Sequence, residues 1–194
     1  MSALVHAAME TERANTDVCT RAAQSSDRDF VLSLAPLLVA SGLPPWRDPR
    51  KLLAAYIEVI GSILRPQGVQ SLARRSDAAL LIAEDEQRTP LGFILLVAAT
   101  DCYTHERHGH VAQIVVADGR QELPAGLALI AAAEEWARSR GYRMLTLGEF
   151  WANHPARAVC QQLGFVEEIV KYRKAVQLRS RRDPMLERNP IKQD

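Results

Sequence analysis

The sequence predicts an α/β fold in which a mixed, mostly antiparallel sheet carries about four helices. A meander of three apolar strands occupies residues 79–117, two amphipathic helices precede it, and strand–helix units follow it. That order is typical of a mixed sheet covered by helices. With 194 residues, 47% of them hydrophobic and 24% charged, the chain is long enough for one domain with its own core.

A short strand and two helices form the part before the meander. Val18–Ala22 is predicted as a strand, and a helix runs from Ser26 to Gly42 with apolar residues at helical spacing. Asp48 caps a second helix, which we expect to stop near Pro66.

The remaining elements are predicted from changes in the spacing of apolar residues along the sequence. Strands are predicted over 79–83, 91–100 and 110–117, and their continuous apolar runs indicate burial on both faces. Further strands are predicted over 143–150 and 165–176. Between them lie helices over 123–140 and 155–163, which end at Gly141 and Gly164. We expect residues 17–177 to form the domain, with a flexible tail over 1–16 and a charged tail over 178–194.

The composition of the chain indicates which partners it is expected to bind and in which cell compartment it is expected to lie. A net charge of +1 gives no field that favours nucleic acid or acidic membranes, so neither is an expected partner. No apolar run approaches the roughly 18 residues of a membrane-spanning helix. The cysteines are far apart and form no pair motif, which indicates a reducing cytoplasm; they are Cys19, Cys102 and Cys160.

One strand–loop–helix unit, residues 110–133, carries the main functional prediction. An apolar strand runs through a short polar loop into a long apolar helix. Unpaired N–H groups at a helix start, together with the helix dipole, favour an anion such as a pyrophosphate. Gly126 lets that anion approach without a Cβ in the way.

This unit resembles the acetyl-CoA-binding motif of the GNAT superfamily of N-acetyltransferases, V-x-P followed by R/Q-x-x-G-x-G/A. Gln121 takes the Arg/Gln position and Gly126 the last Gly position, without gaps. Asp118 stands where Pro is usual, and Pro124, which has no N–H, where the middle Gly is usual. The resemblance implies contacts with acetyl-CoA from Val115, Val116, Ala117, Gln121, Glu122, Leu123, Pro124, Ala125, Gly126 and Leu127.

A second segment, residues 145–165 (LTLGEFWANHPARAVCQQLGF), resembles the family pattern L-x-L-x-V-x-x-x-N-x-x-A-x-x-x-Y-x-x-x-G-F. Asn153 and Ala156 fall on positions that contact CoA in the family. The family's Tyr, often the general acid beside the CoA sulfur, falls on Cys160. The resemblance covers residues 80–174 and implies a GNAT-like sheet of six to seven strands.

Each candidate also has a purely structural interpretation. Glu149 stands where the family is usually apolar; it either takes a proton from an amine or binds the amine, or it forms a salt bridge to a neighbouring Arg. Cys160 is either the general acid or a small buried hydrophobe, and Asn153 can cap a helix as well as contact CoA. Trp46 either lines the acceptor pocket, by analogy with the family, or plugs a hydrophobic gap.

The predicted function is acetyl-CoA-dependent transfer of an acetyl group to a primary amine, by direct transfer. The acceptor is a small molecule or a peptide, and the chain is expected to be a monomer or a homodimer. A module that binds acyl-CoA without catalysis is an alternative, and so is an unrelated α/β binding domain. No metal is expected, because the histidines at 105, 108 and 110 lack further ligands at suitable spacing and are interpreted as exposed hairpin residues.

Overall fold

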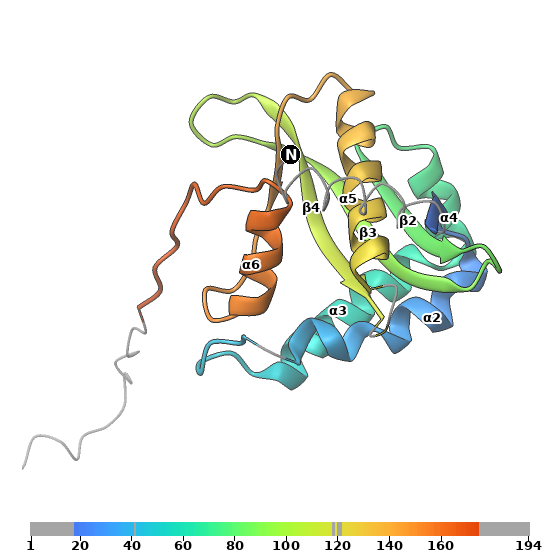
Figure 1. Ribbon diagram of the computed structural model, residues 1–194, viewed down its shortest axis with the longest axis horizontal. Coiled ribbons are helices and arrows are strands. Elements are labelled where there is room, and N and C mark those ends of the chain that lie inside the picture. The colour runs from blue at the N-terminus through green and yellow to red at the C-terminus, as the bar shows by residue number, and fades with distance from the viewer. Residues whose placement is uncertain (1–17, 41, 118, 120–121, 175–194) are drawn as a thin grey trace, which may run out of the picture.

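A computed structural model describes residues 18–40, 42–117, 119 and 122–174 of the chain. It contains a five-stranded sheet with the order β1-β2-β3-β4-β5, which confirms the predicted mixed α/β class (Figure 1). Strands β1 to β4 are antiparallel, and β5 runs parallel to β4. The strands are β1 (Val18–Ala22), β2 (Ala78–Asp85), β3 (Pro90–Thr100), β4 (Arg107–Val116) and β5 (Leu145–Leu147).

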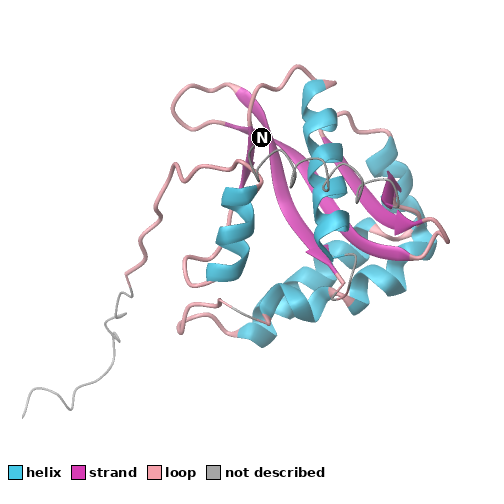
Figure 2. Ribbon diagram, in the orientation of Figure 1, coloured by secondary structure: helices cyan, strands magenta, loops and turns pink. Residues whose placement is uncertain are grey.

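Helices cover both faces of the sheet (Figure 2). One face carries α5 (Glu122–Arg138). The other face carries α2 (Arg28–Ser33), η2 (Ala35–Val39), α3 (Pro49–Ile63) and α4 (Pro66–Ala73), with the short turn η1 (Ser25–Asp27) before them. The last helix, α6 (His154–Gln162), lies beside β4 in Figure 1.

Two hydrophobic clusters, one on each face, form the core. Because side chains alternate along a strand, Ile94 of β3 belongs to the cluster that contains Leu129 of α5, while its neighbour Phe93 belongs to the cluster that contains Ile60 of α3. All four of the buried strands β1 to β4 contribute to these clusters. The sheet is therefore a rigid support on which the ends of β4 and α5 are positioned.

The helices before the meander differ from the prediction in two places. The expected helix over 26–42 is broken into α2 and η2, because Pro36 lacks the N–H that would continue α2. The second helix does end near Pro66, since α3 stops at Ile63, but a further helix that was not predicted, α4, starts at Pro66, where Pro is well tolerated at a first helical position. The chain turns there in little space: a Cβ at Gly68 would lie 2.4 Å from the Ser62 carbonyl oxygen.

Three predicted helix ends are confirmed. The Asp48 carboxylate accepts the N–H groups of Arg50 and Lys51 at 2.9 and 3.3 Å, and so caps α3. Gly141 (φ 73°) and Gly164 (φ 85°) both take the left-handed conformation just after α5 and α6.

The last two strands were predicted incorrectly. β5 spans three residues instead of the expected 143–150, and residues 165–174 form no strand. A three-residue edge offers few backbone partners, and an ion pair between Arg157 of α6 and Glu167 holds the start of this segment beside α6. The sheet therefore has five strands in the described part of the chain, fewer than the six to seven expected. The expected tails, 1–16 and 178–194, lie outside the described residues, and the domain limits stay a prediction.

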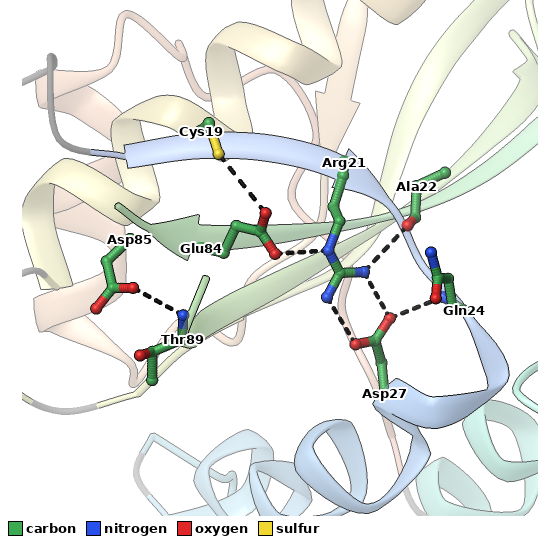
Figure 3. Close-up of polar contacts among 8 residues, drawn as sticks. All are labelled: Cys19, Arg21, Ala22, Gln24, Asp27, Glu84, Asp85 and Thr89. Carbon is green, nitrogen blue, oxygen red and sulfur yellow. Dashed lines mark hydrogen bonds and ion pairs between the residues drawn. The ribbon is translucent and has the colours of Figure 1, made fainter. Parts of the chain in front are cut away.

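A buried ionic cluster joins β1 to its surroundings at the first edge of the sheet (Figure 3). Arg21 donates to both carboxylate oxygens of Asp27 at 2.8 Å and, through Nε, to Glu84 at 2.6 Å. Burial raises the pKa of Asp27, but the hydrogen bonds from Arg21 and from the Gln24 N–H outweigh it, so the pKa is lowered. A shallow hollow of about 420 Å³ lies at the same edge, between β1 and α5. This edge is the one farthest from β5 in the strand order.

No helix in the described part of the chain combines the length and the apolarity that crossing a bilayer requires.

Candidate active site

The centre of the candidate site is the point where β4 separates from β5. The two strands pair only over Gly109–Val111 and Leu145–Leu147. A β-bulge follows at once, since Leu96 of β3 pairs with Val111 and Leu95 with Gln113, which leaves Ala112 without a partner. A bulge bends its strand. The rest of β4 therefore presents a free edge on the side where β5 has ended.

A side-chain contact fixes the place where the strands part. His110 Nδ1 of β4 lies 2.9 Å from Thr146 Oγ1 of β5. Burial, and then the nearby His108, lower the pKa of His110, which is half-buried. The expectation of exposed hairpin histidines is therefore wrong for His110, which lies against β5, and for His108, which is half-buried and belongs to β4 because that strand begins earlier than predicted. His105 is exposed, as expected.

The backbone at the end of β4 directs one amide to the free edge. The Ala117 N–H donates to the Leu91 carbonyl of β3 at 2.7 Å, so it is occupied. Because successive amides of a strand point to opposite edges, the Val115 N–H also faces β3 and the Val116 N–H faces the open side. The Val115 side chain is buried in the cluster under α3, while Val116 and Ala117 are half-buried.

The start of α5 lies at this same end of the sheet, directly after β4. Ala125 is fully buried and anchors the helix on the sheet, whereas 58% of Leu123 is exposed. Pro124 and Leu127 are half-buried. A methyl group on Gly126 would meet no atom within 4 Å, so there is open space beside this residue. Gln121 lies outside the described residues, and for Glu122 only its backbone position in α5 is described.

Amide hydrogens remain available in the first turn of α5. The first four N–H groups of a helix have no partner within it. Pro124 supplies none, and the Ala125 amide is the first that can donate within the helix, which leaves the amides of Glu122 and Leu123 for an anion. The open space at Gly126 fits a bulky group such as a pyrophosphate.

The second predicted segment forms the other wall of the gap. Asn153 caps α6, and its Oδ1 accepts the Ala156 N–H at 3.5 Å. Both residues are half-buried. Cys160, two turns into α6, is half-buried, and burial together with the charge of Glu149 raises the pKa of its thiol. Cys160 therefore remains a protonated thiol at neutral pH.

Glu149 lies in the loop between β5 and α6, on the side that faces α3. It is exposed, and its Oε1 accepts the N–H of Phe150 at 2.7 Å. No salt bridge to Glu149 occurs within the ranges that the structure describes, so the alternative interpretation as an Arg partner is not supported. After burial, the charge of Glu149 is the second cause that raises the pKa of Tyr56 in α3. Glu149 thus acts electrostatically on both α3 and α6.

The loop before α3 reaches the loop before α6. A Cβ on Gly42 (φ 72°) would lie 2.3 Å from the Asn153 Cβ, so the two backbones touch. The Arg47 guanidinium lies 5.5 Å from the centre of the Phe150 ring. Trp46 is 56% exposed, which disagrees with its interpretation as a hydrophobic plug.

Two residues of this region were not predicted as site residues. The Gln113 side-chain oxygen is buried and has no hydrogen-bond partner among the described residues. It follows the bulge and lies on the same face of β4 as Val115. Tyr56 lies within the helix predicted after Asp48 and was given no role there. A polar residue inside the apolar strand over 110–117 was the signal for Gln113, and Tyr56 gave no signal of its own.

Comparison with known proteins agrees with this geometry. Residues 44–165, well over half of the chain, match the model of the acetyltransferase (GNAT) family. The chain belongs to the acetyltransferase (GNAT) family. It is therefore an acyltransferase, and acetyl-CoA is the acetyl donor of this family. The match includes both motif segments, at 121–126 and 145–165. No curated protein sequence matches the chain.

Several solved structures share the fold. A putative acetyl transferase from Pyrococcus furiosus aligns with a TM-score of 0.62 and 18% identity over 82% of this chain and 100% of its own. The aminoglycoside antibiotic 6'-N-acetyltransferase AAC(6')-Ih from Acinetobacter baumannii gives 0.57 and 15%, over 82% and 99%. Ribosomal-protein-alanine N-acetyltransferase from Brucella melitensis biovar Abortus 2308 gives 0.54 and 18%, over 82% and 99%. At these identities the likeness is one of fold.

No group of three or more His, Cys, Asp or Glu side chains suited to a metal ion occurs in the described ranges.

Proposed function

We propose that the chain transfers the acetyl group of acetyl-CoA directly to a primary amine in the gap between β4 and β5. The observation that carries the proposal is the end of β4–β5 pairing after Val111, which leaves the Val116 amide on a free edge. The start of α5 and the open space at Gly126 lie at the same end of the sheet. An acyl donor held there has its pyrophosphate on a helix start and its thioester beside an unpaired amide.

Residues on both sides of the gap would hold the donor. The amides of Glu122 and Leu123 face the pyrophosphate at the first turn of α5, where the helix dipole also favours negative charge. Gly126 leaves room for the phosphate oxygens. Asn153 and Ala156 contact the donor from α6, and Gln121 and Glu122 complete the loop before α5. When bound, acetyl-CoA supplies the activated thioester.

The chain's own groups manage the protons and the developing charge. An amine with a pKa of about 10.4 must lose a proton before it attacks, and Glu149 accepts that proton through a water molecule. The Val116 N–H then donates to the oxyanion, a type of contact that contributes about 2.7–4 kcal/mol. As the C–S bond breaks, the Cys160 thiol, which its raised pKa keeps protonated at neutral pH, donates its proton to the leaving thiolate and regains one from water.

The acceptor enters from the side of α3. Trp46 lies exposed in the loop before that helix, and Glu149 supplies a negative charge for a cationic amine. Enzymes of this fold are named for acceptors as different as an aminoglycoside and a ribosomal-protein alanine. A small-molecule or peptide amine is therefore the proposed acceptor, with neither nucleic acid nor a membrane as partner. The scattered, unpaired cysteines support a cytoplasmic location.

A second candidate function is binding of acyl-CoA without catalysis. Two observations favour it: Pro124 removes one amide from the phosphate site, and Cys160 is shorter than the phenol usual at its position. Measurement of thiol release from acetyl-CoA over a library of amines separates the two functions. We expect release with at least one amine. Binding of CoA with no release for any amine would favour the binding module instead.

A Glu149→Gln variant tests the assignment of the base. We expect kcat to fall at neutral pH and to recover partly at high pH, where more of the amine is already deprotonated. Glu167→Gln is the matched control, because it removes a carboxylate from the exposed start of the segment after α6. Full turnover by Glu149→Gln across the pH range would show that this residue is not the base.

A further inference from the structure

The segment after α6 exposes apolar side chains to an unusual degree. Residues 165–174 (FVEEIVKYRK) are extended, and Figure 1 shows them running away from the sheet. Val166 is 88% exposed, Ile169 63%, Val170 69% and Tyr172 90%. β-branched and aromatic residues in an extended chain favour strand pairing, and an unpaired strand is a template for a second one. The segment has the composition of a strand without a partner in the described part of the chain.

We propose that residues 166–172 pair antiparallel with the same residues of a second copy, which gives a two-fold symmetric dimer. The charges of the segment support this partner. Glu167 and Glu168 lie in its first half, and Lys171, Arg173 and Lys174 in its second half. When two copies run antiparallel, the acidic half of each lies against the basic half of the other.

One register satisfies the side chains best. With Ile169 opposite Ile169 at the two-fold axis, Glu167 lies opposite Lys171 and Val166 opposite Tyr172. Each of these pairs occurs twice by symmetry. Opposite charges and aromatic–β-branched pairs are both favourable across strands. A shift by one residue would place Val166 opposite Arg173 and Glu167 opposite Tyr172, so the aromatic–β-branched pair would be lost, although Glu168 would then face Lys171.

The way in which the segment is anchored favours a second copy over the chain's own sheet. Leu163 and Phe165 pack against the α5-side core, and Glu167 pairs with Arg157 of α6, so the segment leaves the body from a fixed point beside α6. The free edge of its own sheet, β5, is only three residues long. The same segment of another copy provides seven residues to pair with. A carboxylate has two oxygens, so Glu167 can keep Arg157 and also face Lys171.

Charge reversal tests the register in the full-length protein. By sedimentation equilibrium we expect a concentration-dependent dimer. Glu167→Lys and Lys171→Glu should each weaken it about 5- to 10-fold, since two favourable pairs become repulsive. The double variant E167K/K171E should restore it, because the swapped charges again face each other. Arg157→Gln is the control for the ion pair with α6, and should leave the dimer intact.

A cysteine at the axis gives a second, independent measurement. Residues opposite each other in antiparallel strands have Cα atoms about 4.5–5.5 Å apart, which suits a disulfide. Ile169→Cys should therefore give a covalent dimer under mild oxidation. Val170→Cys, which does not face itself, and the unchanged chain with its own cysteines are the controls. A monomeric mass at all concentrations would overturn the proposal. So would a dimer that the charge swap does not rescue, or equal cross-linking through residues 169 and 170.

Discussion

The first and last parts of the chain are built differently. Every buried hydrophobic residue that the structure describes lies between Val18 and Ala137, and most of them belong to the two clusters on the faces of β1 to β4. By contrast, β5 is only half-buried and α6 buries no residue completely. The later part is attached at a few points, among them the contact of His110 with Thr146 and the stacking of Arg47 on Phe150.

The difference places the candidate site on a boundary. One wall, from β4 and α5, is fixed by the core, while the other, from the β5–α6 loop and α6, is held loosely. A ligand that fills the gap adds contacts to the weaker wall. A ligand that binds only the folded state stabilises the folded state. We expect substitutions in the first part to change stability and substitutions in the second part to change binding.

The largest expected effect is a core truncation in α5. Leu129 is fully buried under the sheet, and Leu129→Ala should lower the free energy of unfolding by about 2–5 kcal/mol. The matched truncation in α6 is Val159→Ala, at a residue that is 43% exposed, and it should change stability by less than about 0.5 kcal/mol. Urea unfolding of both variants measures the contrast. Equal losses would show that the two parts share one core.

The next effect compares two ion pairs. Arg21→Ala leaves the buried carboxylates of Asp27 and Glu84 unpaired, and we expect a loss of about 3 kcal/mol, the low end for a buried pair, because 30% of the Arg21 side chain meets water. Arg157→Gln removes an exposed pair with Glu167 and should cost less than about 1 kcal/mol. Thermal unfolding of both variants provides the comparison, and a similar shift for both would contradict it.

Gly126→Ala should separate stability from binding. No atom obstructs a methyl group there, and Ala in place of a helical Gly stabilises by roughly 0.5–1 kcal/mol. The same methyl group would occupy the space proposed for the phosphates, so CoA affinity should fall about tenfold. Thermal unfolding and a CoA titration of the same sample measure the two effects. An unchanged CoA affinity would show that the phosphates do not bind beside Gly126.

The smallest expected effect concerns pH at the junction of β4 and β5. Burial lowers the pKa of His110 in the folded state below the unfolded value of about 6.5. The folded state therefore prefers the neutral ring; this stability is complete above that pH and is lost as the pH falls through 6.5 toward the folded pKa. His110→Asn should reduce the loss of stability between pH 7.5 and 5.5. His105→Gln, at an exposed position, should not.

Local signals in the sequence predicted local structure well. Asp48, Gly141 and Gly164 act on backbone groups within a few residues of themselves, and all three helix ends are confirmed. The limits of β1, Val18–Ala22, were also predicted correctly. The two motif segments were sufficient to indicate the family, since their spacing is fixed by one strand and one helix.

Features that depend on distant partners were predicted poorly. The composition of residues 165–174 suits a strand, but pairing needs an edge, and β5 provides only three residues. The helix end near Pro66 was predicted correctly, but Pro66 is also compatible with the start of a helix, and α4 was missed. Gln113 is a candidate only because its buried oxygen lacks a partner among the described residues. The free Val116 amide likewise depends on where β5 ends.

The most direct test of the proposed donor site is a calorimetric titration of the purified, full-length protein with coenzyme A. We predict saturable heat with one site per chain, because the start of α5 and the end of β4 offer unpaired amides beside open space. The absence of heat with millimolar coenzyme A, from a protein that unfolds cooperatively, would contradict this site.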